Sequence, residues 1–167
     1  MMMEDRTLED KTHWNGQCHC GAVRFAVTLR DGFRSIRRCN CSYCRMRGAV
    51  VVAVEAGGIE ILQGEALLSC YRFHTGAAQH FFCSRCGIAT HLRRRSDPNL
   101  YGVNVACLDG VSPFDFAEVP VADGIHHPND TGGTARQAGV LRFIAAGGSV
   151  SDRSVSDRSV SDRSVTD

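Results

Sequence analysis

Cysteine placement constrains the fold of this 167-residue chain more than any other feature. Seven of its nine cysteines lie in three motifs: Cys18-His19-Cys20, Cys39-Asn40-Cys41-Ser42-Tyr43-Cys44 and Cys83-Ser84-Arg85-Cys86. An odd cysteine count in a chain whose N-terminus shows no export signal argues against a disulfide framework and favours metal binding or thiol chemistry. The fold is therefore expected to bring sulfur atoms from distant parts of the chain together.

The spacing within the motifs suits zinc. A Cys-x-x-Cys turn points both sulfurs at one centre while backbone amides donate to the thiolates. In Cys-x-Cys the two side chains lie on the same face of a strand, so a slight bend brings both to one ion. Two zinc ions per chain are expected, and one division of the seven thiolates is four plus three.

Four cysteines would close a tetrahedral structural site, whereas three leave one position for water or substrate. Cys39, Cys41 and Cys44 lie within six residues and can converge locally, which makes them the three-coordinate candidate. The four-coordinate candidate joins Cys18 and Cys20 to the distant pair Cys83 and Cys86. Spacing alone leaves other divisions open.

Short strands separated by glycine turns are predicted across residues 12–146, so the fold class is mainly β. Residues 21–30 alternate apolar and polar side chains, which is typical of a half-buried strand. Hairpins are expected at Gly57-Gly58 and Thr75-Gly76 because glycine permits the positive φ of a tight turn. Further expectations are a strand at 100–106, a strand or short helix at 140–145 and an irregular excursion at 111–134.

Three segments are predicted: a flexible N-terminus (1–11), a zinc-binding domain (12–146) and a disordered tail of Ser-Val-Ser-Asp-Arg repeats (147–167). The first ten residues are acidic and lack the apolar stretch of a secretory signal, and no run is long enough to span a bilayer, so a cytoplasmic location without membrane attachment is expected. A formal net charge of +1 gives little attraction to phosphate backbones, so nucleic acid is not an expected partner.

Three segments together resemble the glutathione-dependent formaldehyde-activating enzyme family, which also includes centromere protein V. They are Gly16 to Phe25, Cys39 to Arg45 and Phe82 to Gly87, with weaker likeness at Asn104 to Asp109 and at Asp123-Gly124. The resemblance spans residues 14–124 and departs from many relatives at Asn40, where they have histidine.

The resemblance implies a β-tent fold of short antiparallel sheets held together by zinc. It implies structural zinc on Cys18, Cys20, Cys83 and Cys86 and catalytic zinc on Cys39, Cys41 and Cys44. The implied activity is that of a carbon-sulfur lyase of the S-(hydroxymethyl)glutathione synthase type, which condenses glutathione, or a similar thiol, with formaldehyde or another small aldehyde.

Two alternatives are a non-catalytic zinc module that binds a thiol compound or a protein, and a redox or disulfide protein. Arginines flank the three-cysteine motif, where they could meet substrate carboxylates or simply offset the charge of the thiolates. Cys70 and Cys107 belong to no motif and are expected to be buried free thiols. Surface or structural roles are favoured for the histidines, namely His19, His74, His80, His91, His126 and His127.

Overall fold

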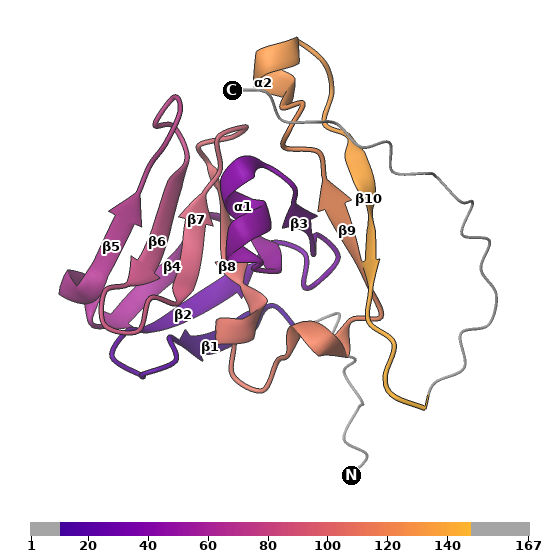
Figure 1. The fold of residues 1–167 in the computed structure, drawn as a ribbon. Coiled ribbons are helices and arrows are strands. Elements are labelled where there is room, and N and C mark those ends of the chain that lie inside the picture. The colour runs from indigo at the N-terminus through magenta and orange to yellow at the C-terminus, as the bar shows by residue number, and fades with distance from the viewer. Residues whose placement is uncertain (1–10, 148–167) are drawn as a thin grey trace, which may run out of the picture.

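The computed structural model describes residues 11–147, which form two sheets with few helices (Figure 1). The larger sheet is antiparallel throughout and has the order β1-β2-β4-β8-β7-β6-β5. Its strands are β1 (His13–Gln17), β2 (Arg24–Leu29), β4 (Val51–Gln63), β5 (Leu68–Tyr71), β6 (Gln79–Cys83), β7 (Ala89–Arg93) and β8 (Leu100–Asn104). The mainly β prediction is confirmed.

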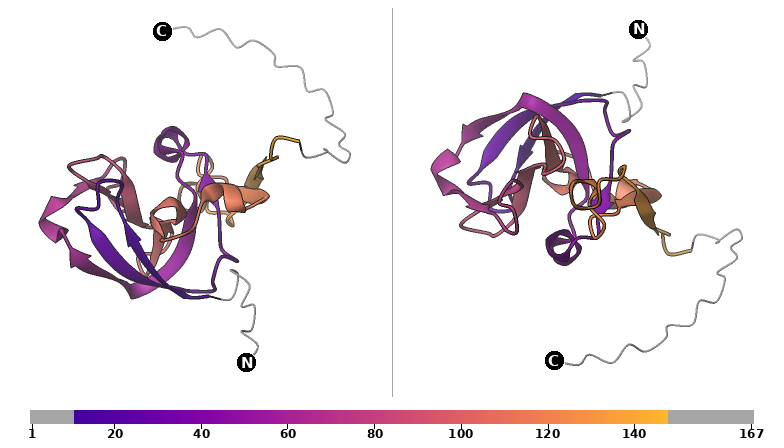
Figure 2. Two further views of the ribbon diagram at one scale, coloured as in Figure 1. Left: turned by 90° about the horizontal axis from the view of Figure 1, so that it is seen from below. Right: turned by 90° about the horizontal axis from the view of Figure 1, so that it is seen from above.

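The smaller sheet has the order β10-β9-β3, in which β9 (Glu118–Ala122) pairs antiparallel with β10 (Gln137–Arg142) and parallel with β3 (Arg38–Cys39). The α-helices are α1 (Ser42–Arg47) and α2 (Pro128–Thr131), and short 3-10 helices cover Glu65–Leu67, Val105–Cys107 and Pro113–Asp115. Figure 2 shows the smaller sheet lying to one side of the larger, curved sheet. None of the described helices has the length and apolar character needed to cross a membrane.

The main core lies against β2. Phe25, Val27 and Leu29 are almost fully buried, and the core around them contains Trp14, Val52, Val54 and Val103. On its other face β2 carries the exposed Arg24 and Thr28, so the predicted alternation over residues 21–30 is confirmed. Burial of these side chains supplies most of the free energy that holds β2 against its neighbours.

The hairpin predicted at Gly57-Gly58 is wrong, because β4 continues through both glycines as one strand. β2 pairs with both halves of β4, and residues 55–58 form an irregularity opposite Thr28. Gly57 has φ +81°, and a Cβ at Gly58 would lie 2.7 Å from Val54 Cγ1. The glycines therefore permit a bulge and a close approach within one strand, since a continuous partner strand keeps the chain from reversing.

The second predicted hairpin is confirmed by the antiparallel pairing of β5 with β6, and β8 lies where a strand was expected at 100–106. Within the segment 140–145, residues 140–142 belong to β10, so the strand was the correct alternative for them. Residues 111–134 were predicted to be irregular, but they contain β9 and α2. Pro120 is tolerated in β9 because β3 pairs only with Val121 and Ala122.

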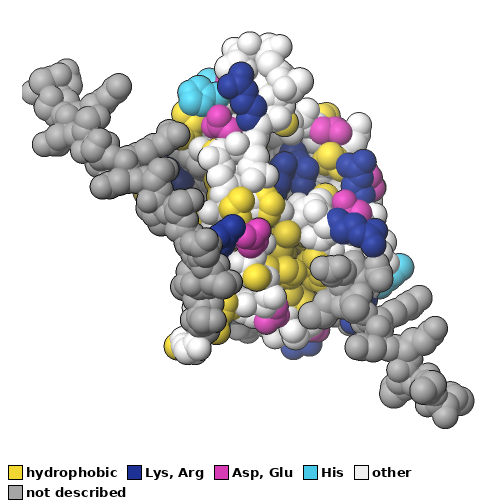
Figure 3. Space-filling model, turned by 90° about the vertical axis from the view of Figure 1, so that its right-hand side faces the viewer, with side chains coloured by type: hydrophobic (Ala, Val, Ile, Leu, Met, Phe, Trp, Pro, Cys, Tyr) yellow, Lys and Arg dark blue, Asp and Glu magenta, His cyan; other side chains and the backbone are white. Residues whose placement is uncertain are grey.

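The smaller sheet keeps several apolar side chains at the surface. Val140, Leu141 and Phe143 are 41–46% exposed, and Phe143 contacts the ring of Phe114. Figure 3 views this side of the molecule and shows hydrophobic side chains gathered among charged ones. The predicted N-terminal segment and repeat tail lie outside the described residues, apart from Lys11 and Gly147.

Candidate metal centres

A four-sulfur cluster joins the turn between β1 and β2 to the turn between β6 and β7. The Sγ atoms of Cys18, Cys20, Cys83 and Cys86 all lie within 4.8 Å of one another. Cys18 Sγ is 3.6 Å from Cys20 Sγ, which is 3.8 Å from Cys83 Sγ. With Zn–S bonds of about 2.3 Å, a tetrahedral zinc site has S···S edges of about 3.8 Å, so this donor set fits zinc.

Burial and backbone hydrogen bonds hold this cluster. Cys18 and Cys83 are at most 1% exposed and pack with the fully buried Val23. The Val23 N–H donates to Cys18 Sγ at 3.3 Å, and the Gly87 N–H donates to the Cys83 carbonyl at 2.8 Å. Burial opposes ionisation of Cys18, but the hydrogen bonds from Val23, Cys20 and Cys83 lower its pKa. The cluster is built to hold thiolates next to an apolar core.

A three-sulfur cluster is formed where β3 leads into α1. Cys39 ends β3, Cys41 is the N-cap of α1 and Cys44 lies in its first turn. Their Sγ atoms lie within 4.8 Å of one another. The Cys41 N–H donates to Cys39 Sγ and the Cys44 N–H donates to Cys41 Sγ, both at 3.4 Å. The helix start thus directs backbone donors at the sulfurs, as a thiolate centre requires.

The charges of the three sulfurs depend on one another. Hydrogen bonds from Cys39 and then Cys44 lower the pKa of Cys41 to about 2. Contacts with Cys39 and then Cys41 raise the pKa of Cys44 well above its ordinary value. One thiolate is therefore stabilised by its neighbours, while three need a compensating cation, and three sulfurs would leave a tetrahedral ion one open position.

The loop after β9 covers the three-sulfur cluster. A Cβ on Gly124 would lie 2.4 Å from Cys39 Sγ and 2.8 Å from Cys41 Cβ, so only glycine fits at this position. The side chain of Asn40 accepts hydrogen bonds from the Gly124 N–H at 2.7 Å and the Ile125 N–H at 3.2 Å. This role of Asn40 was missed from the sequence, because its partners are more than 80 residues away.

Gly124→Ala is expected to displace the loop or Cys39 and to lower the metal affinity of this cluster about 10-fold to 100-fold, the range typical of residues that support metal ligands. Competition with a chromophoric chelator would measure this, because the four-sulfur cluster, which Gly124 does not touch, serves as an internal reference. Gly139→Ala is a matched control, since a Cβ there would meet no atom within 4 Å and neither glycine has a positive φ. Unchanged affinity at both clusters would contradict the close approach.

Two arginines accompany the three sulfurs. Arg47 Nη2 lies 3.9 Å from Cys44 Sγ, Nη1 lies 3.2 Å from His80 Nδ1, and the guanidinium lies over the ring of Tyr43. Burial and then the charge of Arg47 lower the pKa of His80 to about 4, so its ring is neutral near pH 7 and accepts from Arg47. Burial also lowers the pKa of Arg37, whereas the negative charges of Cys39 and then Cys44 act in the opposite direction and raise it.

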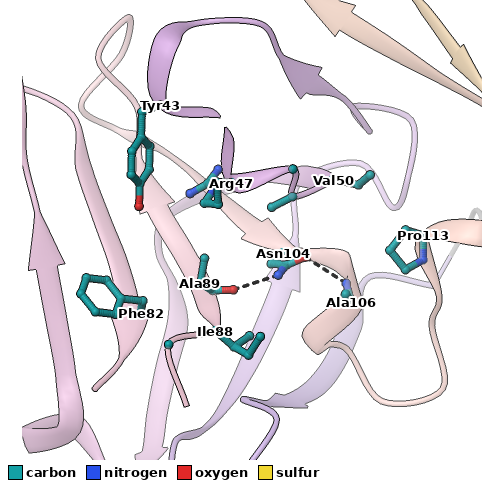
Figure 4. Close-up of a pocket in the computed structure, with 12 residues that line it drawn as sticks. Tyr43, Arg47, Val50, Phe82, Ile88, Ala89, Asn104, Ala106 and Pro113 are labelled. Carbon is teal, nitrogen blue, oxygen red and sulfur yellow. Dashed lines mark hydrogen bonds between the residues drawn. The ribbon is translucent and has the colours of Figure 1, made fainter. Parts of the chain in front are cut away.

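A cavity of about 430 Å³ opens beside α1 (Figure 4). Tyr43 and Arg47 line it from α1, Phe82 and Asn104 line it from the larger sheet, and Ile88 lines it from the turn before β7. Asn104 is held by two hydrogen bonds, since its Nδ2 donates to Ala89 O and its Oδ1 accepts from the Ala106 N–H. The cavity is of the size that holds small organic ligands, and Arg47 links it to the sulfur of Cys44.

The other candidate residues lie apart from the sulfurs or have structural partners. His91 stacks on Phe81, and its burial lowers its pKa to about 4. His19, in contrast, is exposed. His126 pairs with Asp123 at 3.0 Å, whereas the ring of His127 accepts from the Asn129 N–H at the start of α2. These adjacent histidines have different partners, and His74 lies 3.8 Å from Asp130.

The two cysteines outside the motifs differ. Cys107 is 5% exposed and burial raises the pKa of its thiol to about 12, as expected for a buried free thiol. Cys70 is exposed, so its predicted burial is wrong, because it lies on β5 at the edge of the sheet. All nine cysteines lie within the described residues and are free of disulfides.

The fold and the two sulfur clusters define a mainly β domain with two candidate metal centres. The sequence profile described as glutathione-dependent formaldehyde-activating enzyme matches residues 13–119. The chain therefore belongs to the glutathione-dependent formaldehyde-activating enzyme family. This confirms the family resemblance inferred from the three cysteine motifs.

Two relatives illustrate this membership. A Halomonas elongata protein with the provisional name glutathione-dependent formaldehyde-activating enzyme is 35% identical over 82 residues, which cover 44% of this chain and 52% of that protein. The chain thus spans about half the length of this curated relative. The crystal structure of a Rhodobacter sphaeroides protein is 50% identical with a TM-score of 0.63, and the match covers 64% of this chain and 98% of the other.

Proposed function

We propose that this protein condenses glutathione with formaldehyde to S-hydroxymethylglutathione, as a zinc-dependent enzyme of the carbon-sulfur lyase class. Zinc on Cys18, Cys20, Cys83 and Cys86 is structural in this proposal, and zinc on Cys39, Cys41 and Cys44 is catalytic. The observation that carries the proposal is the cluster of these three partly exposed sulfurs beside a cavity, in a chain of this family.

The reaction joins two substrates without an external oxidant or reductant. The thiol loses its proton, its sulfur forms a bond to the aldehyde carbon, and the C=O π bond becomes a hydroxyl when the oxygen takes up a proton. When bound, zinc on three cysteines would supply Lewis acidity, which favours a deprotonated thiol near neutral pH or polarises the aldehyde oxygen. The chain's task is then to place thiol and aldehyde together.

The residues around the three sulfurs suit this task. Arg47 offsets the negative charge of Cys44, and neutral His80 and the ring of Tyr43 hold its guanidinium in place. The cavity beside α1 offers room for part of a tripeptide. The Gly124 loop, fixed by Asn40, keeps the sulfurs in their mutual arrangement.

The functional domain in this proposal is residues 12–146, and the proposed location is the cytoplasm. Seven thiolates in two clusters require a reducing compartment, because oxidation would convert neighbouring cysteines to disulfides. Glutathione, the proposed thiol substrate, is one of the agents that keep cytosolic thiols reduced.

The proposed function is tested by exchange NMR on ¹³C-formaldehyde and glutathione, with and without zinc-loaded protein. Faster exchange into S-hydroxymethylglutathione than in buffer is expected, and the acceleration should scale with the concentration of protein. The same protein stripped of metal by a chelator is the control and should show the buffer rate. An unchanged rate with two zinc ions bound would reject this reaction and favour a module that only binds thiol compounds.

A further inference from the structure

One arginine at the end of β7 has buried N–H groups that find no partner in the described part of the chain. Arg94 directly follows β7, and its Nε and Nη2 atoms are buried without any hydrogen-bond partner among residues 11–147. Its neighbours on either side differ, since Arg93 Nε donates to Pro98 O at 2.9 Å and Arg95 pairs with Asp130. A buried charge without a partner costs stability, so such a group is expected to serve a ligand.

The side chain of Arg94 lies on the face of the sheet that α1 covers. Successive side chains on a strand alternate between faces, so Leu92 and Arg94 share a face. Leu92 pairs with His80 on β6, and His80 contacts Tyr43 and Arg47 of α1. Arg94 therefore belongs to the same face as the helix that carries Cys44.

Gly102 and Val51 lie on this same face of the sheet. Gly102 pairs with Leu92, and a Cβ at Gly102 would point toward the side chains of Leu92 and Val51, at 3.4–3.5 Å. Val51 in turn forms a β-bridge with Arg37, which precedes the three-sulfur cluster.

Arg37 connects Arg94 to the sulfurs. Arg37 lies two residues before Cys39, and its bridge with Val51 places its side chain on the face that Val51 shares with Gly102. In agreement with this placement, burial and then the charge of Arg37 lower the pKa of Arg94 to about 10. No side-chain hydrogen bond or ion pair of Arg37 is found in the described part of the chain. Two arginines without an ion pair in the described residues thus share one face of the sheet, near the three-sulfur cluster.

The nearby acids do not fill this gap. The charges of Asp31 and Asp97 raise the pKa of Arg94 only from a distance. Neither carboxylate forms an ion pair with Arg94 within the described residues. Asp31 Oδ1 accepts from the Ser35 hydroxyl at 2.8 Å, and Asp97 Oδ1 accepts from the Asn99 N–H at 2.9 Å. No anion of the described residues therefore pairs with Arg94, and a carboxylate ligand could take this place.

We propose that Arg94 and Arg37 form a subsite that binds a carboxylate of the thiol substrate. The proposal rests on the proposed function, which it deepens by selecting thiols that carry a carboxylate over neutral thiols. A guanidinium fork matches the two oxygens of a carboxylate, and Arg94 offers buried N–H groups where such a bond is strong. Arg94 is a specificity-determining residue in this proposal.

The test uses calorimetric binding of S-methylglutathione and its diethyl ester to the zinc-loaded full chain. The ester keeps the peptide but loses both carboxylates. Arg94→Met is expected to weaken binding of the diacid about 10-fold to 100-fold and to leave binding of the ester unchanged. Arg93→Met, on the opposite face of β7, is the matched control and should bind both probes like the wild type.

Stability gives a second, independent readout. Because Arg94→Met removes a buried unpartnered charge, the ligand-free variant is expected to melt at or above the Tm of the wild type. A lower Tm would assign Arg94 a structural role and overturn the subsite. Equal affinity of wild type and Arg94→Met for S-methylglutathione, or no binding by the wild type, would also overturn it.

Failure of the subsite and failure of the proposed function are distinguishable. If the wild type accelerates the condensation but Arg94→Met binds the diacid unchanged, the function stands and the subsite is wrong. If the wild type does not accelerate the condensation but diacid binding depends on Arg94, the carboxylate subsite stands and the proposed reaction is wrong.

Discussion

Cys41→Ser is expected to reduce the protein-dependent formation of S-hydroxymethylglutathione by at least about 100-fold, while the fold persists. Loss of a residue that merely supports a ligand costs about 10-fold to 100-fold, so loss of a ligand should cost more. Cys41 is the central member of its cluster. The Cys44 N–H donates to its sulfur, and hydrogen bonds from Cys39 and then Cys44 lower the pKa of its thiol. Cys41 is half-buried and outside both core clusters, so folding should survive.

Three measurements check this expectation. Exchange NMR gives the rate, elemental analysis should give one zinc per chain in place of two, and far-ultraviolet circular dichroism should match the wild type. Cys70→Ser is the matched control, since it makes the same chemical change at an exposed cysteine outside both clusters. Wild-type rates with one zinc ion bound would remove the three-sulfur cluster from the reaction.

Cys83→Ser is expected to have the largest effect on stability, lowering the free energy of unfolding by about 4 kcal/mol or more. Cys83 is 0% exposed and ends β6, and its sulfur shares a cluster with cysteines 63 residues or more earlier in the chain. A metal held there links the β1–β2 turn to β6, so loss of a ligand removes both metal binding and this link. Thermal and urea unfolding followed by circular dichroism would measure the change.

Cys107→Ser is the matched control for Cys83→Ser. Cys107 is also buried, but it belongs to neither sulfur cluster, and its thiol donates only to Ala89 O at 3.5 Å. A loss of about 1 kcal/mol is expected there, because serine can make the same hydrogen bond. Equal losses of stability in Cys83→Ser and Cys41→Ser would contradict the division into a structural and a catalytic centre.

Local patterns predicted much of the fold. The alternation in residues 21–30 identified β2 because one face of that strand is buried, and Thr75-Gly76 identified the β5–β6 hairpin. Gly57-Gly58 misled the prediction because a paired glycine permits a bulge as well as a turn, and only the pairing of β2 along both halves of β4 selects the bulge. The sequence did not predict β9 for two reasons. Proline, here Pro120, is uncommon inside strands, and the partners of β9 lie elsewhere in the chain.

The sequence by itself determined which sulfurs are neighbours within each motif, since a spacing of two or three residues brings side chains together in a turn whatever the rest of the chain does. Only the tertiary structure decided what surrounds them. The Gly124–Asn40 contact spans 84 residues, and strand pairing brings Arg94 and Arg37 to one face of the larger sheet. Such contacts depend on how strands pair and how closely backbones approach, which long-range packing sets and local spacing does not encode.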